Sequence, residues 1–321
     1  MNKLALASLG AALALSVSGC GPKPKPVPVP APIAAEPAAP VGSLGWAVQG
    51  PWRIERARDQ ARHPAETLAF FGLRPDMTVV EVFPGRGWYS AVLAPYLARG
   101  GGKLYEASFD PLTATAAQMA TMQEFKARFM QAPQTFGAIQ LTVLSPTSGA
   151  IAPDGSADMV LVMRNVHTFM AEGYAEKAFR DIFAALKPGG ILGIEEHRAK
   201  STGLQDPQAG DGYVQEAFVK MLAQEAGFEF VGSSEINANP KDTKDYPFGV
   251  WTLPPVLRSA PLGAPDDARF DHAKYLAIGE SDRMTLKFRK PGGGVGAPAQ
   301  TGTQPDAIAP HGNKPGKGKR K

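Results

Sequence analysis

Short apolar runs and longer amphipathic stretches alternate along the chain between residues 53 and 290. Runs rich in Val, Ile, Leu and Phe are typical of strands that a sheet buries on both faces. The stretches between them carry apolar residues at helical spacing, and Gly or Pro ends several of them. Strands are predicted over 77–83, 103–108, 139–144, from 157 into a loop near Asn165, 191–197, 228–236 and 283–290, and helices over 53–71 with a break at His63-Pro64, 91–97, 112–129, 174–186 and 213–226.

The order of these elements predicts an α/β fold. Helices separate the first five strands, so these strands are expected to run parallel in a sheet that is covered on both faces. The last two strands have no helix between them, which indicates an antiparallel edge. The long Pro-rich segment between them contains Trp251, and segments of this kind often cover a functional site.

Proline placement divides the chain. Of 30 prolines, 8 fall in residues 22–45 and 5 in residues 291–321. The alternating prolines of residues 21–45 favour an extended linker, and the Gly-rich, basic residues 291–321 are predicted to be a disordered tail. Residues 46–290 then form one folded domain.

The charge pattern argues against a nucleic-acid partner. The net charge is +4, and Lys and Arg exceed Asp and Glu by four within residues 291–321 alone. Residues 1–45 add a further excess of two positive charges (Lys3, Lys23 and Lys25 against Glu36), so residues 46–290 carry a net charge of −2. A nucleic-acid-binding domain usually presents a basic face.

The first 20 residues have the layout of a secretory signal: one Lys, an apolar run from Leu4 to Val17, and small residues before Cys20. The apolar run is shorter than a membrane-spanning helix. Val17-Ser18-Gly19-Cys20 resembles the lipobox of bacterial lipoproteins, which implies a lipidated Cys20, a membrane anchor and, with Gly21 next, the outer membrane facing the periplasm. Cys20 is the single cysteine, so the chain forms no internal disulfide.

Four local motifs, in this order, resemble those of the class I S-adenosylmethionine (SAM)-dependent methyltransferases. The resemblance covers residues 65–290 and implies a seven-stranded, Rossmann-like methyltransferase sheet and SAM as cofactor. The motifs are Val79-Val80-Glu81-Val82-Phe83-Pro84-Gly85-Arg86-Gly87, Asp154-Gly155-Ser156-Ala157-Asp158, Leu186-Lys187-Pro188-Gly189-Gly190 and Ala226-Gly227-Phe228.

The strand-to-helix turn with Gly85 and Gly87 is the candidate cofactor site, because glycines let backbone N–H groups approach a ligand. By the resemblance, Glu81 lies under this turn and contacts the amino-acid end of SAM. Two positions depart from the family pattern. Phe83 stands where the family usually has Gly, and Ser108 stands where an acidic residue binds the ribose. Asp110 is predicted to take over that contact; its alternative role is a helix cap.

Polar residues that follow the fourth and fifth strands are the candidate catalytic group, because ligands bind at the carboxyl ends of parallel strands. Asn165 and His167 follow the fourth strand, and Glu196 and His197 end the fifth. His167 is the predicted base for a small-molecule acceptor. The alternative is that each histidine only orders its own loop. His63, Tyr89 and Glu196 are predicted in a lid or acceptor pocket. No tight ligand spacing indicates a metal site.

Two functions remain open. A nicotinamide-dinucleotide fold usually has the pattern G-x-G-x-x-G or A in this turn, and here Ser90 stands where the third Gly or the Ala would be. Methyl transfer is therefore the preferred interpretation. SAM, however, is made in the cytosol, whereas Cys20 indicates export. The alternative is an envelope lipoprotein that keeps the methyltransferase fold but binds another small ligand without catalysis.

Overall fold

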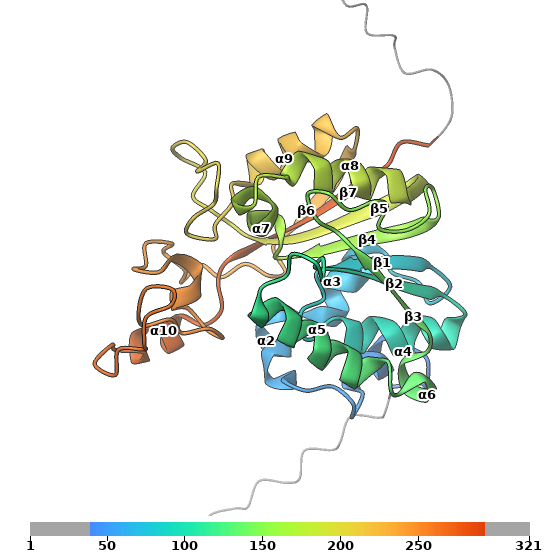
Figure 1. Ribbon diagram of the computed structural model, residues 1–321, viewed down its shortest axis with the longest axis horizontal. Coiled ribbons are helices and arrows are strands. Elements are labelled where there is room, and N and C mark those ends of the chain that lie inside the picture. Colours follow the sequence, from blue (N-terminus) through green and yellow to red (C-terminus); the bar gives the residue numbers. More distant parts are fainter. Residues whose placement is uncertain (1–38, 293–321) are drawn as a thin grey trace, which may run out of the picture. The chain divides into compact units, whose positions relative to one another are not determined.

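The structure, a computed structural model, describes residues 39–292 (Figure 1). Cys20 with the predicted signal peptide, most of the Pro-rich linker and nearly all of the basic tail lie outside the described residues. Between residues 39 and 292, no helix has both the length and the apolar character needed to cross a membrane.

The described residues alternate between strands and helices. The strands are β1 (Thr78–Val82), β2 (Lys103–Ser108), β3 (Ile139–Val143), β4 (Ala157–Met163), β5 (Leu186–His197), β6 (Glu229–Ser234) and β7 (Arg283–Arg289). The helices are α1 (Leu44–Gln49), α2 (Asp59–Arg62), α3 (Pro64–Phe71), α4 (Ser90–Gly100), α5 (Ala116–Phe129), α6 (Pro133–Phe136), α7 (Val166–Ala171), α8 (Ala175–Ala185), α9 (Glu216–Glu225) and α10 (Ala273–Ile278), with 3₁₀ turns η1 (Arg56–Arg58) and η2 (Gly249–Thr252).

All seven strands form one sheet in the order β3-β2-β1-β4-β5-β7-β6. Strands β1 to β5 pair in parallel, whereas β7 is antiparallel to both β5 and β6. The predicted Rossmann-like methyltransferase sheet is therefore confirmed. The antiparallel edge is the β7–β6 pair, and the reversed strand β7 lies one position inside β6. Residues 235–282 connect these two neighbouring antiparallel strands.

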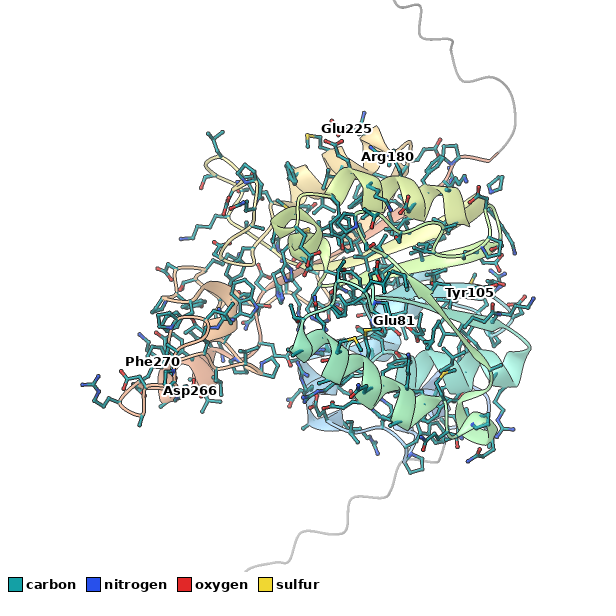
Figure 2. All side chains as sticks on the ribbon, viewed as in Figure 1. Glu81, Tyr105, Arg180, Glu225, Asp266 and Phe270 are labelled. Atoms are coloured by element: carbon teal, nitrogen blue, oxygen red, sulfur yellow. The ribbon has the colours of Figure 1, made fainter. Side chains whose placement is uncertain are left out.

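Helices cover both faces of the sheet (Figure 1). Successive strand residues point to opposite faces, so Val80 and Val82 enter a core with α7, α8 and α9, while Val79 enters a core with α3, α4 and α5. Figure 2 shows Glu81 deep between sheet and helices, whereas Arg180 and Glu225 lie on the outer side of α8 and α9. The apolar strand pattern thus reports burial on both faces.

One predicted loop is a helix. The segment from Arg164 to His167 was expected to be irregular, but α7 begins at Val166. The buried carboxylate of Glu196 accepts the backbone N–H groups of Val166 and His167, and such N–H groups at a helix start have no partner within the helix. A contact from another strand therefore stabilises the start of this helix.

The predicted helix over 213–226 starts later, at Glu216, because Val214 pairs with Arg198 beyond the end of β5. The predicted helix over 112–129 likewise starts at Ala116. There, Thr115 and Gln118 form a capping box with reciprocal side-chain-to-backbone hydrogen bonds.

The β6–β7 connection, which carries α10 (orange in Figure 1), is anchored by buried polar groups. Asn237 Nδ2 donates to Thr67 Oγ1 at 2.9 Å and to Thr285 Oγ1 at 3.0 Å. Asp282 accepts from Arg198 and Lys244. These bonds tie the connection to α3 and to β5, so its residues 250–256 are held at the end of the sheet.

Candidate functional site

A cavity of about 520 Å³ lies at the carboxyl ends of β1, β4 and β5. Open α/β sheets bind ligands at this end of their strands. The β6–β7 connection supplies one wall, so the predicted cover is in place. The lining residues are Glu55, Arg58, Arg62, Phe83, Pro84, Gly85, Arg86, Trp88, Met163, Arg164, Asn165, His167, His197, Val250, Trp251, Leu253, Pro254, Pro255, Val256, Glu280 and Ser281.

The two glycines of the β1–α4 turn have different roles. Gly85 has φ +58° and lines the cavity, and a Cβ at this position would meet no atom within 4 Å. Gly87 has φ +78°, but a Cβ there would lie 2.2 Å from the Phe129 ring. Gly85 therefore leaves open space for a ligand, whereas Gly87 is required by packing against α5.

Phe83 occupies the turn in an unusual conformation. Its φ is +49°, a region that favours glycine. Its ring stacks on Phe109 with centroids 4.4 Å apart and packs edge-on against Phe169. The space between the ends of β1 and β2, which a glycine here would leave open, is filled by aromatic rings.

Glu81 lies behind the cavity wall. It is buried, does not line the cavity, and accepts a hydrogen bond from Ser90 Oγ at 2.7 Å. Its register partner on β2 is Glu106, also fully buried, and neither carboxyl oxygen of Glu106 has a hydrogen-bond partner. Burial raises the pKa of Glu81 to about 7 and, together with the charge of Glu81, raises the pKa of Glu106. The pair is a buried carboxyl dyad that retains a proton at neutral pH.

Asp110 is not brought to the cavity. Its Oδ1 accepts the backbone N–H of Leu112 at 2.9 Å, and the residue lines neither the large cavity nor the apolar cleft of about 90 Å³ beside Ser108 and Phe109. Asp110 therefore orders its own turn, and neither predicted role is found: the cap of the following helix is Thr115.

Asn165 joins two strand ends. Its Nδ2 donates to the carbonyl oxygens of Val82 at 3.0 Å and Met163 at 3.2 Å. This fixes the turn after β4 against the turn after β1. The residue also lines the cavity.

His167 and Glu196 form a hydrogen-bonded pair, with His167 Nδ1 3.0 Å from Glu196 Oε1. Because a carboxylate only accepts, Nδ1 carries the proton, and Nε2 is left as an acceptor. Since His167 lines the cavity, this arrangement orients an imidazole for proton transfer. The structure thus brings together two of the residues predicted at the strand ends.

His197 lies beside this pair, with its ring centroid 5.4 Å from that of His167. Its Nδ1 lies 2.6 Å from Ser281 Oγ. Burial, together with the neighbouring His167 and Arg164, lowers the pKa of His197 well below its ordinary value. His197 is therefore a neutral imidazole at physiological pH.

Within residues 39–292, His167, Glu196 and His197 are the one group of three or more His, Cys, Asp or Glu residues that could together bind a metal ion. Their potential metal-ligand atoms lie within 4.8 Å of one another. Glu196 is not free to bind an ion, because its two oxygens face four N–H groups: those of Val166, His167 (backbone and Nδ1) and His197. Two imidazoles remain, near several guanidinium groups. This charge distribution favours an anion over a metal cation.

His63 and Tyr89, predicted to contact the acceptor, lie outside the cavity lining. His63 sits between α2 and α3 with φ +40°, and its Nδ1 is 3.4 Å from Asn237 Oδ1. Tyr89 is buried, and its hydroxyl donates to Glu195 Oε2 at 3.0 Å. Both residues support the cavity wall from behind.

Buried ion pairs form the charged wall. Glu195, fully buried on β5, pairs with Arg164 Nη1 at 2.9 Å and with Arg283 Nη1 at 3.3 Å. Burial alone would raise the pKa of Glu195, but the neighbouring guanidinium groups lower it. Glu195 is therefore ionised in the folded protein.

Glu280, on the β6–β7 connection, extends the same network. Its carboxylate accepts from Arg58 at 2.8 Å, Arg62 at 2.7 Å and Arg283 at 3.0 Å. Burial opposes ionisation, but Arg62, Arg283 and Arg58 outweigh it and lower the pKa of Glu280 to about 2. Burial and the charges of nearby arginines lower the pKa of Arg62 to about 9.

Sequence reasoning did not select Arg62, Arg283 or Glu280 as site residues. Arg62 and Glu280 pair across 218 positions of the chain, and Arg283 donates to the carbonyl oxygen of Ala61 across 222 positions. One signal in the sequence could have indicated a buried ion-pair network: Glu195 lies within an apolar strand, and charged residues are rarely buried unless they are paired.

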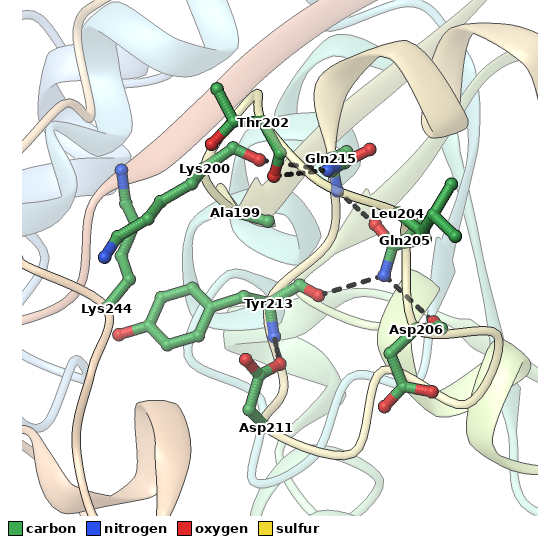
Figure 3. A pocket seen from close by; sticks show the side chains of 10 residues that line it. All are labelled: Ala199, Lys200, Thr202, Leu204, Gln205, Asp206, Asp211, Tyr213, Gln215 and Lys244. Carbon is green, nitrogen blue, oxygen red and sulfur yellow. Dashed lines mark hydrogen bonds between the residues drawn. The ribbon is translucent and has the colours of Figure 1, made fainter.

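Among the other cavities of the described residues, one of about 190 Å³ lies in the loop after β5 (Figure 3). Gln215 Nε2 donates to the carbonyl oxygens of Lys200 and Gly203, and Gln205 Nε2 donates to that of Asp206. The polar side chains of this cavity therefore hold the backbone of the loop. The cavity shares no lining residue with the cavity at the carboxyl ends of β1, β4 and β5.

No protein-family model matches the sequence, and no curated protein matches it. Among solved structures, the chain is similar to a SAM-dependent methyltransferase from Aquifex aeolicus, with 20% identity over 57% of this chain and 88% of that one, and a TM-score of 0.43. It is also similar to a TehB-like SAM-dependent methyltransferase from Corynebacterium glutamicum, with 16% identity over 74% of this chain and 95% of that one, and a TM-score of 0.41. A third similar structure is the [4+2]-cyclase SpnF, with 15% identity over 76% of this chain and 86% of that one, and a TM-score of 0.48.

We expect the Glu81–Glu106 dyad to make stability depend on pH. A carboxyl whose pKa is raised by folding stabilises the protein below its ordinary pKa, and this contribution is lost as the pH rises through about 7. The free energy of unfolding should fall between pH 5 and 8, by up to about 1.4 kcal/mol per pH unit for each proton released. Glu106→Gln should flatten this decline, because the amide can donate to ionised Glu81.

Urea unfolding at half-unit pH steps would measure this dependence, with Glu229→Gln as the control, because Glu229 is an exposed glutamate. An identical pH dependence in the wild type and in Glu106→Gln would show that the dyad does not retain the proton.

Proposed function

We propose that this chain is a SAM-dependent methyltransferase that acts on a small-molecule acceptor. The observation that carries the proposal is that the Gly85 turn and the His167–Glu196 pair belong to one cavity at the carboxyl ends of β1, β4 and β5. A cofactor-binding turn and a base at the same cavity are the two elements that methyl transfer to an oxygen or nitrogen requires.

The residues around the cavity fit the amino-acid end of SAM. Gly85 leaves open space beside the backbone, and Asn165 presents its side-chain oxygen, which has no hydrogen-bond partner within residues 39–292. Gly85 would hold the cofactor by its backbone, and Asn165 would accept from the ammonium group. The ribose end has no acid, since Ser108 ends β2 and Asp110 faces its own turn.

When bound, SAM supplies a methyl group on a positively charged sulfur. The chain's own residues prepare the acceptor. His167 Nε2 accepts the proton that the acceptor loses, and Glu196 holds the ring by its Nδ1–H and stabilises the imidazolium. His197, neutral and buried, completes this wall without adding charge. The connection that carries Trp251 excludes water from the reacting atoms.

We also propose that Cys20 anchors the domain in the cell envelope. The proposal rests on the signal layout of residues 1–20 and on the lipobox-like Val17-Ser18-Gly19-Cys20. Acyl chains contribute about 0.8 kcal/mol per buried methylene, so two or more chains on one residue hold a soluble domain at a membrane.

A second function, the binding of a different small ligand without methyl transfer, is favoured by one observation. The Phe83 and Phe109 rings stack on each other, with centroids 4.4 Å apart, at the ends of β1 and β2, where the resemblance to methyltransferases would place the adenosine. Binding of adenine at this place requires the Phe83 ring to move.

We expect S-adenosylhomocysteine to bind the full chain, measured by isothermal titration calorimetry. Gly85→Val should weaken binding at least tenfold, because the side chain enters the open space. Gly101→Val is the matched control: Gly101 also has a positive φ and open space at Cβ, but it ends α4 away from the cavity. The Gly101→Val variant should bind S-adenosylhomocysteine with the same affinity as the wild type.

Phe83→Gly separates the two functions. If the Phe83 ring only blocks the place of the adenosine and can move aside, Phe83→Gly should bind S-adenosylhomocysteine more tightly than the wild type. If neither folded protein takes up the ligand at millimolar concentration, the methyltransferase proposal is wrong and the binding function replaces it.

We expect His167→Ala to lower turnover by about 100-fold or more, the usual contribution of a general base. Product formation from labelled SAM with an envelope extract is the first measurement. Affinity for S-adenosylhomocysteine should remain within about twofold. His272→Ala, in the β6–β7 connection outside the cavity, is the control. Undiminished turnover in folded His167→Ala would exclude this role.

We expect the full chain to be found in the membrane fraction of a bacterium that processes lipoproteins, and Cys20→Ser to be released from it. Mass spectrometry of the N-terminus checks the modification. A wild-type protein that retains Met1 and is found in the cytosol would contradict the anchor.

A further inference from the structure

The guanidinium groups of Arg62 and Arg164 have more N–H groups than protein acceptors. Arg62 Nε donates to Glu280, and Arg164 Nη1 donates to Glu195. Their remaining guanidinium N–H groups have no hydrogen-bond partner within residues 39–292. The arginine nitrogens that are both buried and without a partner are Nε of Arg53 and of Arg283. The free N–H groups of Arg62 and Arg164 therefore reach the open space of the cavity that both residues line.

This wall also carries excess positive charge. Four arginines share two buried carboxylates, those of Glu195 and Glu280, through contacts of 2.7 to 3.3 Å. A third acid, Glu55, lies at the exposed rim and pairs with Arg58. On this wall, one positive charge remains after Glu55, Glu195 and Glu280 are counted, in a place partly shielded from water, where charges interact more strongly than in bulk solvent. The carboxylate of Glu196 belongs to the other face of β5, where four N–H groups already occupy its two oxygens.

Arg62 is held in place before any ligand binds. Its guanidinium lies over the Trp88 ring, 5.0 Å from the centroid, and Glu280 fixes its Nε. These two contacts restrict the position of the guanidinium group, whose N–H fork can bind the two oxygens of a carboxylate or phosphate.

The neighbouring wall of the same cavity is apolar. Residues Val250, Trp251, Leu253, Pro254, Pro255 and Val256 of the β6–β7 connection supply it. Ligand sites commonly combine such apolar surface with a few polar groups that fix orientation.

We propose that this cavity binds a small amphipathic anion, in which a carboxylate or phosphate contacts Arg62 and Arg164 and an apolar body contacts the wall of residues 250–256. The proposal concerns a ligand other than SAM and holds whether or not the chain transfers methyl groups. Within the proposed methyl transfer, such an anion would be the acceptor, placed beside His167.

Calorimetry on the full chain with benzoate, phenyl phosphate and their neutral analogue benzamide tests the proposal. At least one anion should bind with a Kd below about 1 mM, and benzamide at least tenfold more weakly. Arg62→Gln and Arg164→Gln should each weaken anion binding about tenfold or more, since each removes a charged hydrogen-bond donor. Arg289→Gln is the matched control, because Arg289 is half exposed and paired with Glu229 on β6.

Several results would overturn the proposal: benzamide binding as tightly as benzoate, acetate and inorganic phosphate binding as tightly as the aromatic anions, or no heat from any anion with the folded protein. The relative affinities of benzoate and phenyl phosphate identify the oxyanion.

Competition with S-adenosylhomocysteine distinguishes the source of the anion. Simultaneous binding of benzoate and S-adenosylhomocysteine supports a separate ligand. Mutual exclusion, with Arg62→Gln weakening both equally, would assign the arginines to the cofactor's own carboxylate and overturn the proposal. Binding of benzoate without any binding of S-adenosylhomocysteine would leave the anion site standing while the methyltransferase proposal fails.

Discussion

The organisation of the cavity depends on two adjacent buried carboxylates at the end of β5. Successive residues of a strand face opposite sides of the sheet, so Glu195 and Glu196 serve different clusters. Glu196 faces the side of α7, where it accepts the first N–H groups of that helix and orients His167. Glu195 faces the other side and gathers Arg164, Arg283 and the hydroxyl of Tyr89. One dipeptide thus sets both polar walls.

Buried charge explains why these walls hold distant segments together. An ionised carboxylate is costly to bury unless it is paired, and removal of one partner from a buried pair commonly costs about 3–5 kcal/mol. Glu280 brings its own segment, between α10 and β7, against Arg58 and Arg62 of the N-terminal helices. The closure of the β6–β7 connection over the sheet is therefore coupled to charge neutralisation as well as to apolar packing. The same pairing leaves guanidinium N–H groups directed into the cavity.

The carboxyl ends of the parallel strands are open to a ligand over β1, β4 and β5 but closed between β1 and β2. Over β1, β4 and β5 the cavity is open, with Gly85, Asn165 and His167 on its lining. Between β1 and β2 the Phe83 and Phe109 rings are stacked, and the Glu81–Glu106 dyad lies on the α4 side of the same two strands. The departures from the methyltransferase motif, at Phe83 and Ser108, both fall on this closed half. Under the proposed methyl transfer, the open half would hold the acceptor and the closed half the adenosine.

The sequence by itself determined the sheet. Alternating apolar strands and helices depend on local patterns, and apolar runs such as residues 77–83 report burial on both faces whatever their partners are. It also located the glycine turn and the strand-end residues Asn165, His167, Glu196 and His197, because parallel strands end at one edge. Tertiary structure decided which of these residues meet. Only the fold showed that Gly87 packs against Phe129, that Asp110 orders its own turn, and that Glu196 starts a helix at Val166. The arginine network was invisible for the same physical reason: a charge is neutralised by whichever partner lies near it in space, and Arg62 and Glu280 are 218 positions apart in the chain.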